Sequence, residues 1–330
     1  MTDKILMGEQ AVAETGANAD GVACDILMAT YNSARYLRPM VRSIKAQRNR
    51  DFRLIIRDDG SSDDTVAILL DELRDFDLPV VLYAGEASGS AKANFTRLLH
   101  RSTAPYTMYA DADDLWDDTK VDVTLQALRE AEARLGAETP IYVHSDARVV
   151  NGEDAVIAPS YRAFKRMGDL RRFTFANMLV CAPMIGCTAG SNRALNLLAR
   201  DTPLDAVTGH DWWMLLVAAV FGHVEPIEQP TMSYRVHGNN SSGPKKVDLG
   251  QYLRAEGKFA KVRRGMDLRR AQAKALVDVF GDRLPAKSRR AIERFVATGD
   301  QGFIARRIAI LAGGYLYRDM PRNVAMLVGA

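Results

Sequence analysis

The stretch from Tyr109 to Asp118, YADADDLWDD, gathers carboxylates directly behind an apolar run. Clustered carboxylates repel one another unless a cation or a developing positive charge holds them together. A D-x-D pair such as Asp111 and Asp113 can bind Mg²⁺ or Mn²⁺ through few protein oxygens, which leaves coordination positions for a diphosphate. The alternative is the acidic start of a helix, which suits Asp117 and Asp118 better than Asp111. The stretch therefore predicts either a metal site or a solvated helix start.

A second acidic turn, DDGSSDDT, begins at Asp58 behind the apolar run Leu54-Ile55-Ile56. A carboxylate on a turn at a strand end, here Asp58 or Asp59, can accept the imide N–H of a uracil or thymine base. The other interpretation is a plain helix N-terminus, in which side chains of the turn cap free backbone amides. Capping explains the serines but not two consecutive acids before the glycine.

Two later motifs carry further candidate groups. In GHDWW, Asp211 lies in the first turn of an otherwise apolar helix, where it is either a base or a simple N-cap. The neighbouring Trp212 and Trp213 can pack in the core or present a face to a sugar ring. In YRVHGNN, His237 is a candidate metal ligand or phosphate contact, although a single loop histidine is more often solvated.

The elements that must position these groups follow from apolar runs and helical spacing. Strands are predicted near residues 25–30, 54–56, 79–83, 106–110 and 141–144, and helices after Ser33 and over residues 66–73, 91–100, 120–134 and 211–221. Strands that alternate with helices in this way predict an α/β fold with a mostly parallel sheet. Ligands of such sheets bind beyond the carboxyl ends of the strands, where Asn32, Asp58, Asp59 and Asp111–Asp114 would converge.

The ordered set of motifs is more specific than any one of them. The series strand-YN, DDGSxDDT, KANF, DADD, GCTAGSNRAL, HDWW and YRxHGNN resembles that of the family 2 inverting glycosyltransferases, and more narrowly their rhamnosyltransferase-like branch. The resemblance covers roughly residues 24–245. It implies the GT-A fold, a Rossmann-like, mostly parallel central sheet flanked by helices, which a C-terminal α-helical extension would follow.

The resemblance also implies which residues bind a nucleoside-diphosphate sugar. Asp59, together with Asp58, would hold the base beside the backbone of Ala29 and Tyr31. Lys92 stands where the family usually has a basic residue near the nucleotide.

The reacting end of the donor would meet a second group of residues. Asp111 would bind ribose or sugar hydroxyls, and Asp113 would ligate the divalent metal, Mg²⁺ or Mn²⁺. His237 would be a further metal ligand or a phosphate contact. Asp211 would be the catalytic base, and the residue before it is His210 rather than the acid of the family's E-D motif.

The acceptor would bind on the opposite side of the sugar. Gly190 and Asn192 match the segment that shapes the acceptor pocket in the family, and Trp212 could supply a face for a sugar ring. In the implied reaction the base deprotonates an acceptor hydroxyl, which attacks the anomeric carbon in one inverting displacement. The metal would offset the charge that builds on the leaving diphosphate.

Composition places the chain among globular proteins, since its 330 residues are 47% hydrophobic and 26% charged. Residues 1–22, which lack the apolar core of a signal peptide, are predicted to form a flexible leader. Residues 23–244 would form the catalytic domain and residues 245–330 a basic helical extension, with Gly238–Lys246 as the linker. Three scattered cysteines argue against a disulfide framework or structural zinc and favour a reducing cytoplasm.

Charge is distributed unevenly along the chain. From Lys245 onward there are 19 Lys and Arg against 8 Asp and Glu, whereas the preceding residues carry 25 against 33. A helix predicted over residues 303–318 carries apolar residues on one face and arginines alongside: Ile304, Ile308, Leu311, Tyr315, Arg306 and Arg307. Such a helix could lie on the inner leaflet of the membrane or pack against the sheet domain. The expected location is cytoplasmic or peripheral on the inner face of the cell membrane, and nucleic-acid binding has little support.

The expected function is transfer of a sugar to a hydroxyl of a glycan or lipid-linked acceptor in surface polysaccharide synthesis, with dTDP-rhamnose as the preferred donor. Three alternatives stay open: a UDP-hexose donor, a non-catalytic nucleotide-sugar-binding relic, and a phosphatase of the haloacid-dehalogenase type. In the phosphatase, Asp111 would be the nucleophile and Asp113 the acid, but that family usually carries its D-x-D on the first strand.

Overall fold

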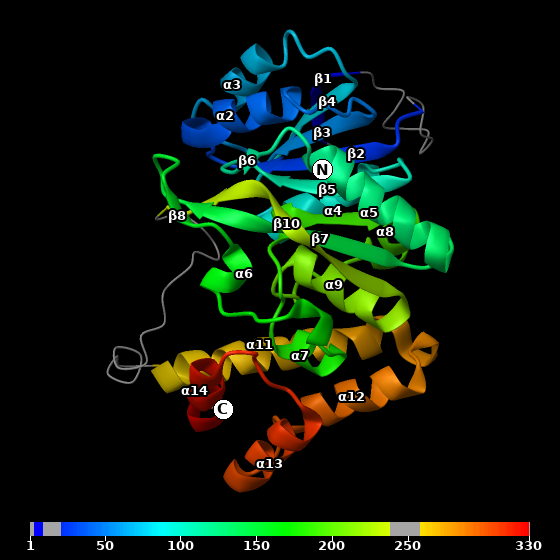
Figure 1. The fold of residues 1–330 in the computed structure, drawn as a ribbon, viewed down its shortest axis with the longest axis vertical. Coiled ribbons are helices and arrows are strands. Elements are labelled where there is room, and N and C mark those ends of the chain that lie inside the picture. The colour runs from blue at the N-terminus through cyan, green and yellow to red at the C-terminus, as the bar shows by residue number, and fades with distance from the viewer. Residues whose placement is uncertain (1–2, 9–20, 238–257, 330) are drawn as a thin grey trace.

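The computed structural model describes residues 3–8, 21–237 and 258–329. Ten strands of the described residues form one sheet, with helices on both of its faces and a layer of C-terminal helices beyond one face (Figure 1). The predicted linker Gly238–Lys246, and with it the predicted boundary at residue 244, lies outside the described residues. The α/β architecture with a mostly parallel sheet and a C-terminal helical part is confirmed.

The strands are β1 Lys4–Met7, β2 Cys24–Thr30, β3 Phe52–Asp58, β4 Val80–Ala84, β5 Tyr106–Asp111, β6 Leu115–Trp116, β7 Ile141–Val150, β8 Val156–Ala158, β9 Ala189–Asn192 and β10 His223–Arg235. The helices are α2 Ala34–Lys45, α3 Thr65–Glu72, α4 Ala91–Arg101, α5 Lys120–Leu135, α6 Tyr161–Phe164, α7 Phe175–Val180, α8 Arg193–Ala199, α9 His210–Phe221, α11 Lys258–Phe280, α12 Ala286–Ala297, α13 Phe303–Gly313 and α14 Met320–Gly329. Short 3-10 turns, η1 to η3, cover Leu170–Arg172, Gly186–Thr188 and Gly281–Arg283.

Four adjacent strands, in the order β4-β3-β2-β5, run parallel and form the half of the sheet that carries the acidic motifs. Their register pairs Thr30 with Asp58 and Ala29 with Asp111. The carboxyl ends of these strands therefore meet at one edge, as expected for a ligand site of an α/β sheet. Strands β2, β3 and β5 are buried along almost their whole length because helices cover both faces.

The other half of the sheet is mixed and was not predicted beyond the start of β7. Strand β9 joins β5 to β7 and is antiparallel to both, and β10 pairs parallel with β7 along most of its length. At the opposite edge, β1 pairs antiparallel with β4. The prediction of a flexible leader over residues 1–22 is therefore wrong for Lys4–Met7, which add an edge strand to the sheet.

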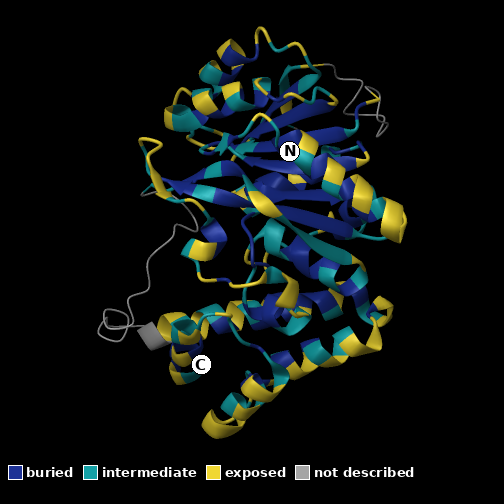
Figure 2. Ribbon diagram, in the orientation of Figure 1, coloured by how far each residue is buried: buried dark blue, intermediate teal, exposed yellow. Residues whose placement is uncertain are grey.

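The C-terminal helices pack on the sheet domain through α9. This helix is almost entirely apolar and lies between the sheet and α11 (Figure 1), so that Trp213 is fully buried. One continuous core extends from Tyr109 on β5 through Trp213 to Phe295 on α12. Figure 2 shows the buried residues continuing from the sheet into this layer, while exposed residues dominate α13.

The predicted helix over residues 303–318 is shorter in the structure. It ends with α13 at Gly313, because Gly314 adopts a left-handed conformation (φ 68°) that closes the helix. Tyr315 is consequently not on its exposed face but is buried, and its hydroxyl donates to the carbonyl oxygen of Ala291 at 2.7 Å. Ile304, Ile308 and Leu311 stay exposed. No helix among the described residues is both long and apolar enough to cross a bilayer.

Candidate functional site

A cleft of about 610 Å³ opens at the carboxyl ends of β2 and β5, bounded by the starts of α2 and α4 and by the end of β10. It brings together six of the predicted site residues: Ala29, Tyr31, Asp59, Asp111, Asp113 and His237. Its other lining residues include Asn32, Tyr36, Asn94, Phe95 and Tyr234. The convergence of separate loops that the sequence predicts is thus present in the structure.

Asp113 and His237 lie next to each other at the surface of this cleft. The imidazole Nε2 of His237 lies 2.8 Å from Oδ2 of Asp113, and the His237 ring stacks on Tyr36 with a centroid distance of 4.9 Å. Arg235 contacts the same residues, since its guanidinium lies over the Tyr36 ring and donates to the backbone carbonyl of Asp113. A carboxylate and an imidazole presented together to a cleft form an O/N donor set suited to Mg²⁺ or Mn²⁺.

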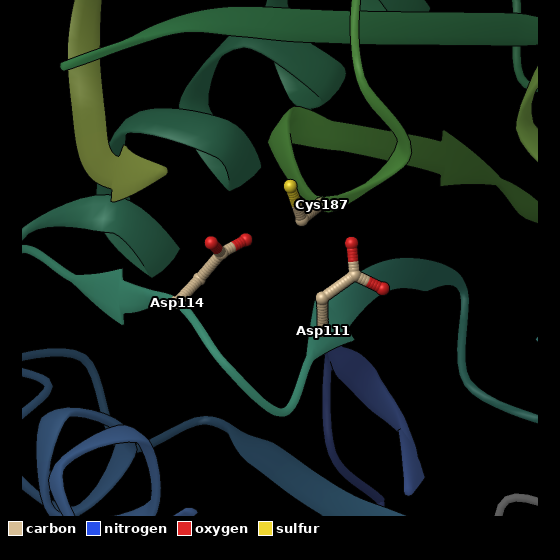
Figure 3. Close-up of side chains that lie close together, drawn as sticks. All are labelled: Asp111, Asp114 and Cys187. Atoms are coloured by element: carbon tan, nitrogen blue, oxygen red, sulfur yellow. The ribbon is translucent and has the colours of Figure 1, made fainter. Parts of the chain in front are cut away.

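Behind Asp113, the side chains of Asp111, Asp114 and Cys187 point into one small space (Figure 3). Burial raises the pKa of Asp111 to about 7, and the nearby charges of Asp113 and Asp211 act in the same direction. Burial also raises the pKa of Asp114 well above its ordinary value, with the charges of Asp113 and Asp111 adding to the effect. The fully buried Asp114 accepts the backbone N–H of Arg235 at 3.0 Å and so ties β10 to the acidic loop.

This inner cluster is a second set of possible cation ligands, but it is less suited to a diphosphate. Asp114 and Cys187 are buried and do not line the cleft, whereas Asp113 and His237 do. A cation between Asp114 and Cys187 would therefore be separated from a ligand in the cleft. Cys187 was not among the predicted site residues, although it lies in the GCTAGSN motif.

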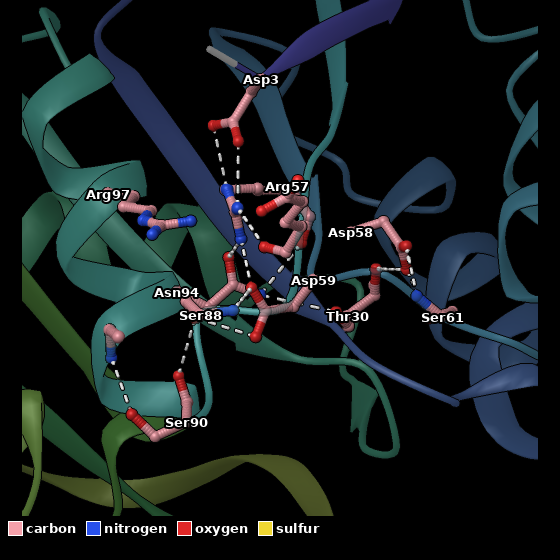
Figure 4. A network of polar contacts seen from close by, with 12 residues as sticks. Asp3, Thr30, Arg57, Asp58, Asp59, Ser61, Ser88, Ser90, Asn94 and Arg97 are labelled. Atoms are coloured by element: carbon pink, nitrogen blue, oxygen red, sulfur yellow. Dashed lines mark hydrogen bonds and ion pairs between the residues drawn. The ribbon is translucent and has the colours of Figure 1, made fainter. Parts of the chain in front are cut away.

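Asp59 is held in the cleft wall by a buried network (Figure 4). Its carboxylate accepts the backbone N–H of Ser88 at 2.7 Å and the Ser88 hydroxyl at 2.8 Å, and Arg57 donates to it at 2.5 Å. The fully buried guanidinium of Arg57 also donates to Asn94 at 3.0 Å and to both oxygens of Asp3 at 2.9 and 3.0 Å. Burial works against it, but the hydrogen bonds and charge of Arg57 hold the pKa of Asp3 below its ordinary value.

Asp58 has a different position from Asp59. It is buried, does not line the cleft, and accepts hydrogen bonds from the hydroxyl of Thr30 at 3.0 Å and from the backbone N–H of Ser61 at 2.9 Å. These bonds fix the turn that follows β3 against the end of β2. The structure therefore gives Asp58 a local structural contact and leaves Asp59 as the carboxylate of this pair that faces the cleft.

Asp211 lies in the first turn of α9, close to Asp111. Its charge contributes to the raised pKa of Asp111, and its own Oδ1 accepts the backbone N–H of Trp212 at 2.8 Å. A Cβ atom at Gly186 would lie 3.0 Å from the Cβ of Asp211, so the glycine of η2 leaves room for this side chain. Asp211 therefore lies close to Asp111, which lines the cleft, although Asp211 itself is not among the lining residues.

His210 points away from this acidic group into the core. Its ring stacks on Phe95 with a centroid distance of 4.2 Å, and burial lowers its pKa despite the nearby charge of Asp211. A neutral imidazole therefore takes the place of the first acid of the family's E-D motif, and it supports Phe95 from behind the cleft wall.

Besides Asp58 and Asp211, four predicted contacts do not line the cleft. Lys92 points the other way, and its Nζ donates to the carbonyl oxygens of Leu204 and Val207 at 2.5 and 2.8 Å. Gly190 and Asn192 lie on β9, which runs antiparallel to β5, so that Asn192 is opposite Tyr106 at the far end of that strand. Asn192 there caps α8.

The fourth, Trp212, is partly buried beneath α11. Its Nε1 donates to the carbonyl oxygen of Met178 at 2.8 Å, and the guanidinium carbon of Arg269 lies 5.7 Å from the centre of its ring. Gly190 and Asn192 are likewise buried within β9, so the structure gives no support to the predicted acceptor pocket at these residues. The residues of the GCTAGSN segment that lie beside the acidic side chains are Gly186, next to Asp211, and Cys187, next to Asp111 and Asp114.

Two curated relatives cover much of the chain. An uncharacterized glycosyltransferase of Nostoc sp. is 22% identical over 224 residues, which are 66% of this chain and 65% of the Nostoc protein. The chain thus spans slightly less than two thirds of that relative. The dTDP-rhamnosyl transferase RfbG of Shigella flexneri is 25% identical over 239 residues, which are 69% of this chain and 77% of RfbG.

Solved structures show the same fold at lower identity. S. aureus TarS 1-349 in complex with UDP-GlcNAc superimposes with a TM-score of 0.57 and 13% identity, covering 93% of this chain and 79% of TarS. Mannosyltransferase PcManGT of Pyrobaculum calidifontis, in complex with GDP-Man and Mn²⁺, gives a TM-score of 0.55 and 15% identity, covering 88% of this chain and 73% of PcManGT. These likenesses confirm the predicted GT-A type of fold.

The family model of Glycosyl transferase family 2 matches residues 25–194, which contain the turn after β3, the D-x-D loop and the GCTAGSN segment. Because this match spans more than half of the chain, the protein belongs to glycosyl transferase family 2.

Proposed function

We propose that the protein is a metal-dependent, inverting glycosyltransferase that takes its sugar from a nucleoside-diphosphate donor. The observation that carries this proposal is the arrangement at the cleft, which is lined by Asp59, Asp111 and the Asp113–His237 pair and has Asp211 close to Asp111. An inverting transferase needs one base and a means of stabilising the leaving diphosphate. Asp211 would supply the base, and the Asp113–His237 pair would hold the group that stabilises the diphosphate.

The chain's own residues divide the work between donor and acceptor. Asp59 would accept the imide N–H of the base, and its fixed hydrogen bonds to Ser88 and Arg57 would hold it in position. Asp111 would contact ribose or sugar hydroxyls. Asp211 would remove the proton from an acceptor hydroxyl, whose oxygen bonds to the anomeric carbon as the bond from that carbon to the diphosphate breaks.

Asp113 and His237 would hold Mg²⁺ or Mn²⁺. Their oxygen and nitrogen atoms lie 2.8 Å apart at the cleft surface, and a donor set of this chemistry fits either cation. A bound divalent cation would offset the charge on the leaving diphosphate.

The donor we favour is dTDP-rhamnose, which agrees with the similarity to RfbG. The acceptor would be a hydroxyl of a glycan or lipid-linked molecule in surface polysaccharide synthesis. A UDP-hexose donor and a non-catalytic relic are the alternatives. The phosphatase alternative gains no support, because β5 is preceded by four strands in the chain.

Calorimetric titration with dTDP, UDP and GDP, each with and without Mn²⁺, tests the donor site directly. We expect dTDP or UDP to bind only with Mn²⁺. In the presence of acceptor extract, we expect dTDP-rhamnose to release dTDP, or a UDP-hexose to release UDP. Metal-dependent binding without any turnover would favour the relic. Absence of nucleotide binding under all conditions would overturn the proposal.

We also propose that the protein contacts the inner face of the cell membrane through α13. Ile304 and Ile308 are 72% and 61% exposed on one side of this helix, next to Arg306 and Arg307. Apolar side chains beside cations suit the surface of an anionic bilayer. The variant Ile304→Glu/Ile308→Glu should lose binding to phosphatidylglycerol vesicles in co-sedimentation, whereas Leu268→Glu, which changes an exposed apolar residue of α11, should keep it. Equal binding of both variants would contradict this contact.

A further inference from the structure

A second cavity of about 400 Å³ lies between α11 and α14, and we call it the α11/α14 pocket. Three cationic side chains line it, Lys261 and Arg269 from α11 and Arg322 from α14, and none of its nine lining residues is acidic. Its remaining surface is mainly apolar, with Val262, Met266 and Met326 among the lining residues. A pocket with this composition suits a ligand that has both an anionic group and an apolar part.

Two of these cations, Arg269 and Arg322, lie over an aromatic ring. The guanidinium carbons of Arg269 and Arg322 lie 5.7 and 5.9 Å from the centre of the Tyr317 ring, on which both arginines converge. Arg322 also has an ion-pair partner in Asp319, at 3.5 Å. Among the described residues, the buried Nε of Arg269 has no hydrogen-bond partner. An N–H donor in that position is available to an anion such as phosphate.

The pocket is connected to the proposed catalytic base through a single side chain. Arg269 lies over the ring of Trp212 with its guanidinium carbon 5.7 Å from the ring centre, and Trp212 directly follows Asp211 in the first turn of α9. Gly265 contributes to this geometry, since a Cβ there would lie 2.9 Å from Nη1 of Arg269. An anionic group held by Arg269 would therefore lie beside Trp212 at the first turn of α9, and not in the donor cleft.

The apolar part of such a ligand has a surface to follow. Val324 and Val328 of α14 are exposed, and Arg307 of α13 donates to the carbonyl oxygen of Val328 at 3.2 Å, which places the exposed side of α13 next to α14. An alkyl chain leaving the α11/α14 pocket could thus remain in contact with apolar side chains.

We infer that the α11/α14 pocket binds the phosphate group of an amphipathic, lipid-linked acceptor, with Arg269 and Lys261 as its principal cationic contacts. This inference rests on the proposed glycosyltransferase function and specifies the acceptor class. The glycan end of the acceptor would extend past Trp212 towards Asp211.

The test is calorimetric binding of three probes to the full chain: dodecyl phosphate below its critical micelle concentration, the uncharged dodecyl maltoside, and inorganic phosphate. The wild type should bind dodecyl phosphate more tightly than either of the others. Arg269→Gln and Lys261→Gln should each weaken this binding roughly tenfold, the size expected for the loss of one charge-assisted contact. Arg269→Lys should retain most of it. Arg263→Gln is the matched control, because Arg263 is exposed on the same helix and does not line the pocket.

The inference is overturned if Arg263→Gln weakens binding as much as the pocket variants do, if dodecyl maltoside binds equally well, or if inorganic phosphate alone accounts for the affinity. Lys261 is exposed, so Lys261→Gln keeps the test valid even if the Arg269 variants fold poorly. Nucleotide binding with Mn²⁺ is measured on the same samples. If it persists while the pocket result fails, only the acceptor inference is lost, and if the wild type binds no nucleotide, the proposed function itself is lost.

Discussion

The Nε2 atom of His237 lies 2.8 Å from Oδ2 of Asp113, although the two residues are 124 positions apart in the chain. The contact joins the loop after β5 to the segment after β10, and the stacking of His237 on Tyr36 adds the first turns of α2 to the same corner. Three distant parts of the chain thus converge on one pair of potential ligand atoms, which are also exposed to the cleft.

Asp113→Asn should abolish the dependence of nucleotide affinity on Mn²⁺. The substitution replaces a negatively charged metal ligand by a neutral amide. Loss of a residue that only hydrogen-bonds to a metal ligand costs about 10–100-fold in metal affinity, so loss of the ligand's charge should weaken Mn²⁺ binding by at least that factor. Calorimetric titration with dTDP or UDP at fixed Mn²⁺ measures it. Asp118→Asn, in the same acidic stretch but exposed and paired with Arg48, should bind like the wild type. Equal losses in both variants would contradict the assignment.

Asp211→Asn should separate chemistry from donor binding. Loss of a general base reduces kcat by roughly 10²–10⁴-fold, whereas the proposed nucleotide contact of Asp59 and metal contact of Asp113 are untouched. The measurement is a pair of values for the same sample, the rate of sugar transfer and the dissociation constant of the nucleotide. A variant that loses both, with an unchanged unfolding transition, would show that Asp211 acts in donor binding instead.

The sequence predicted the cleft better than it predicted the side chains behind it. Asp59, Asp111 and Asp113 could be identified because each closely follows an apolar run. The parallel order of the strands then brings these residues to the same edge of the sheet. The pairing of Arg57 with Asp3 could not be predicted, because the two residues are 54 positions apart and the segment after Asp3 showed no strand signal. An arginine inside the apolar run of β3 was the available sign that an acid must be buried nearby.

The second half of the sheet was missed for two physical reasons. Strand β9 has only four residues, AGSN, which carry no β-branched or aromatic side chains. Strand β10 contains Pro226 and Pro230, which lower its apparent strand character, and its pairing with β7 is irregular at both. Because the direction of β9 was unknown, Gly190 and Asn192 were predicted at the site, whereas Gly186 and Cys187 are the residues of this segment that lie beside the acidic side chains.

Asp3→Ala should destabilise the protein although it lies outside the region matched by the family. Removing it leaves two N–H groups of the buried Arg57 guanidinium without this partner, while the ion pair with Asp59 remains, so the cost should be about 1–3 kcal/mol. Urea unfolding measures the difference, and Lys4→Ala, at an exposed neighbour on β1, is the control. Nucleotide affinity should fall as well, because Arg57 also orients Asp59. A loss of stability no greater than that of Lys4→Ala would contradict the importance of this network.

His144 should make the fold sensitive to acid. Burial lowers the pKa of this β7 histidine from 6.5 to about 3, and the charge of Arg162, whose Nη2 lies 3.2 Å from its Nδ1, acts in the same direction. Between these values the unfolded chain binds a proton that the folded protein excludes, so the free energy of unfolding should fall as the pH drops below 6.5. From pH 7 to pH 5 this residue should account for about 2 kcal/mol of lost stability. Urea unfolding at both pH values should therefore show a smaller loss in His144→Gln than in the wild type. His100→Gln, at an exposed histidine, should lose as much as the wild type, and a slope that is the same in all three proteins would show that His144 does not carry the effect.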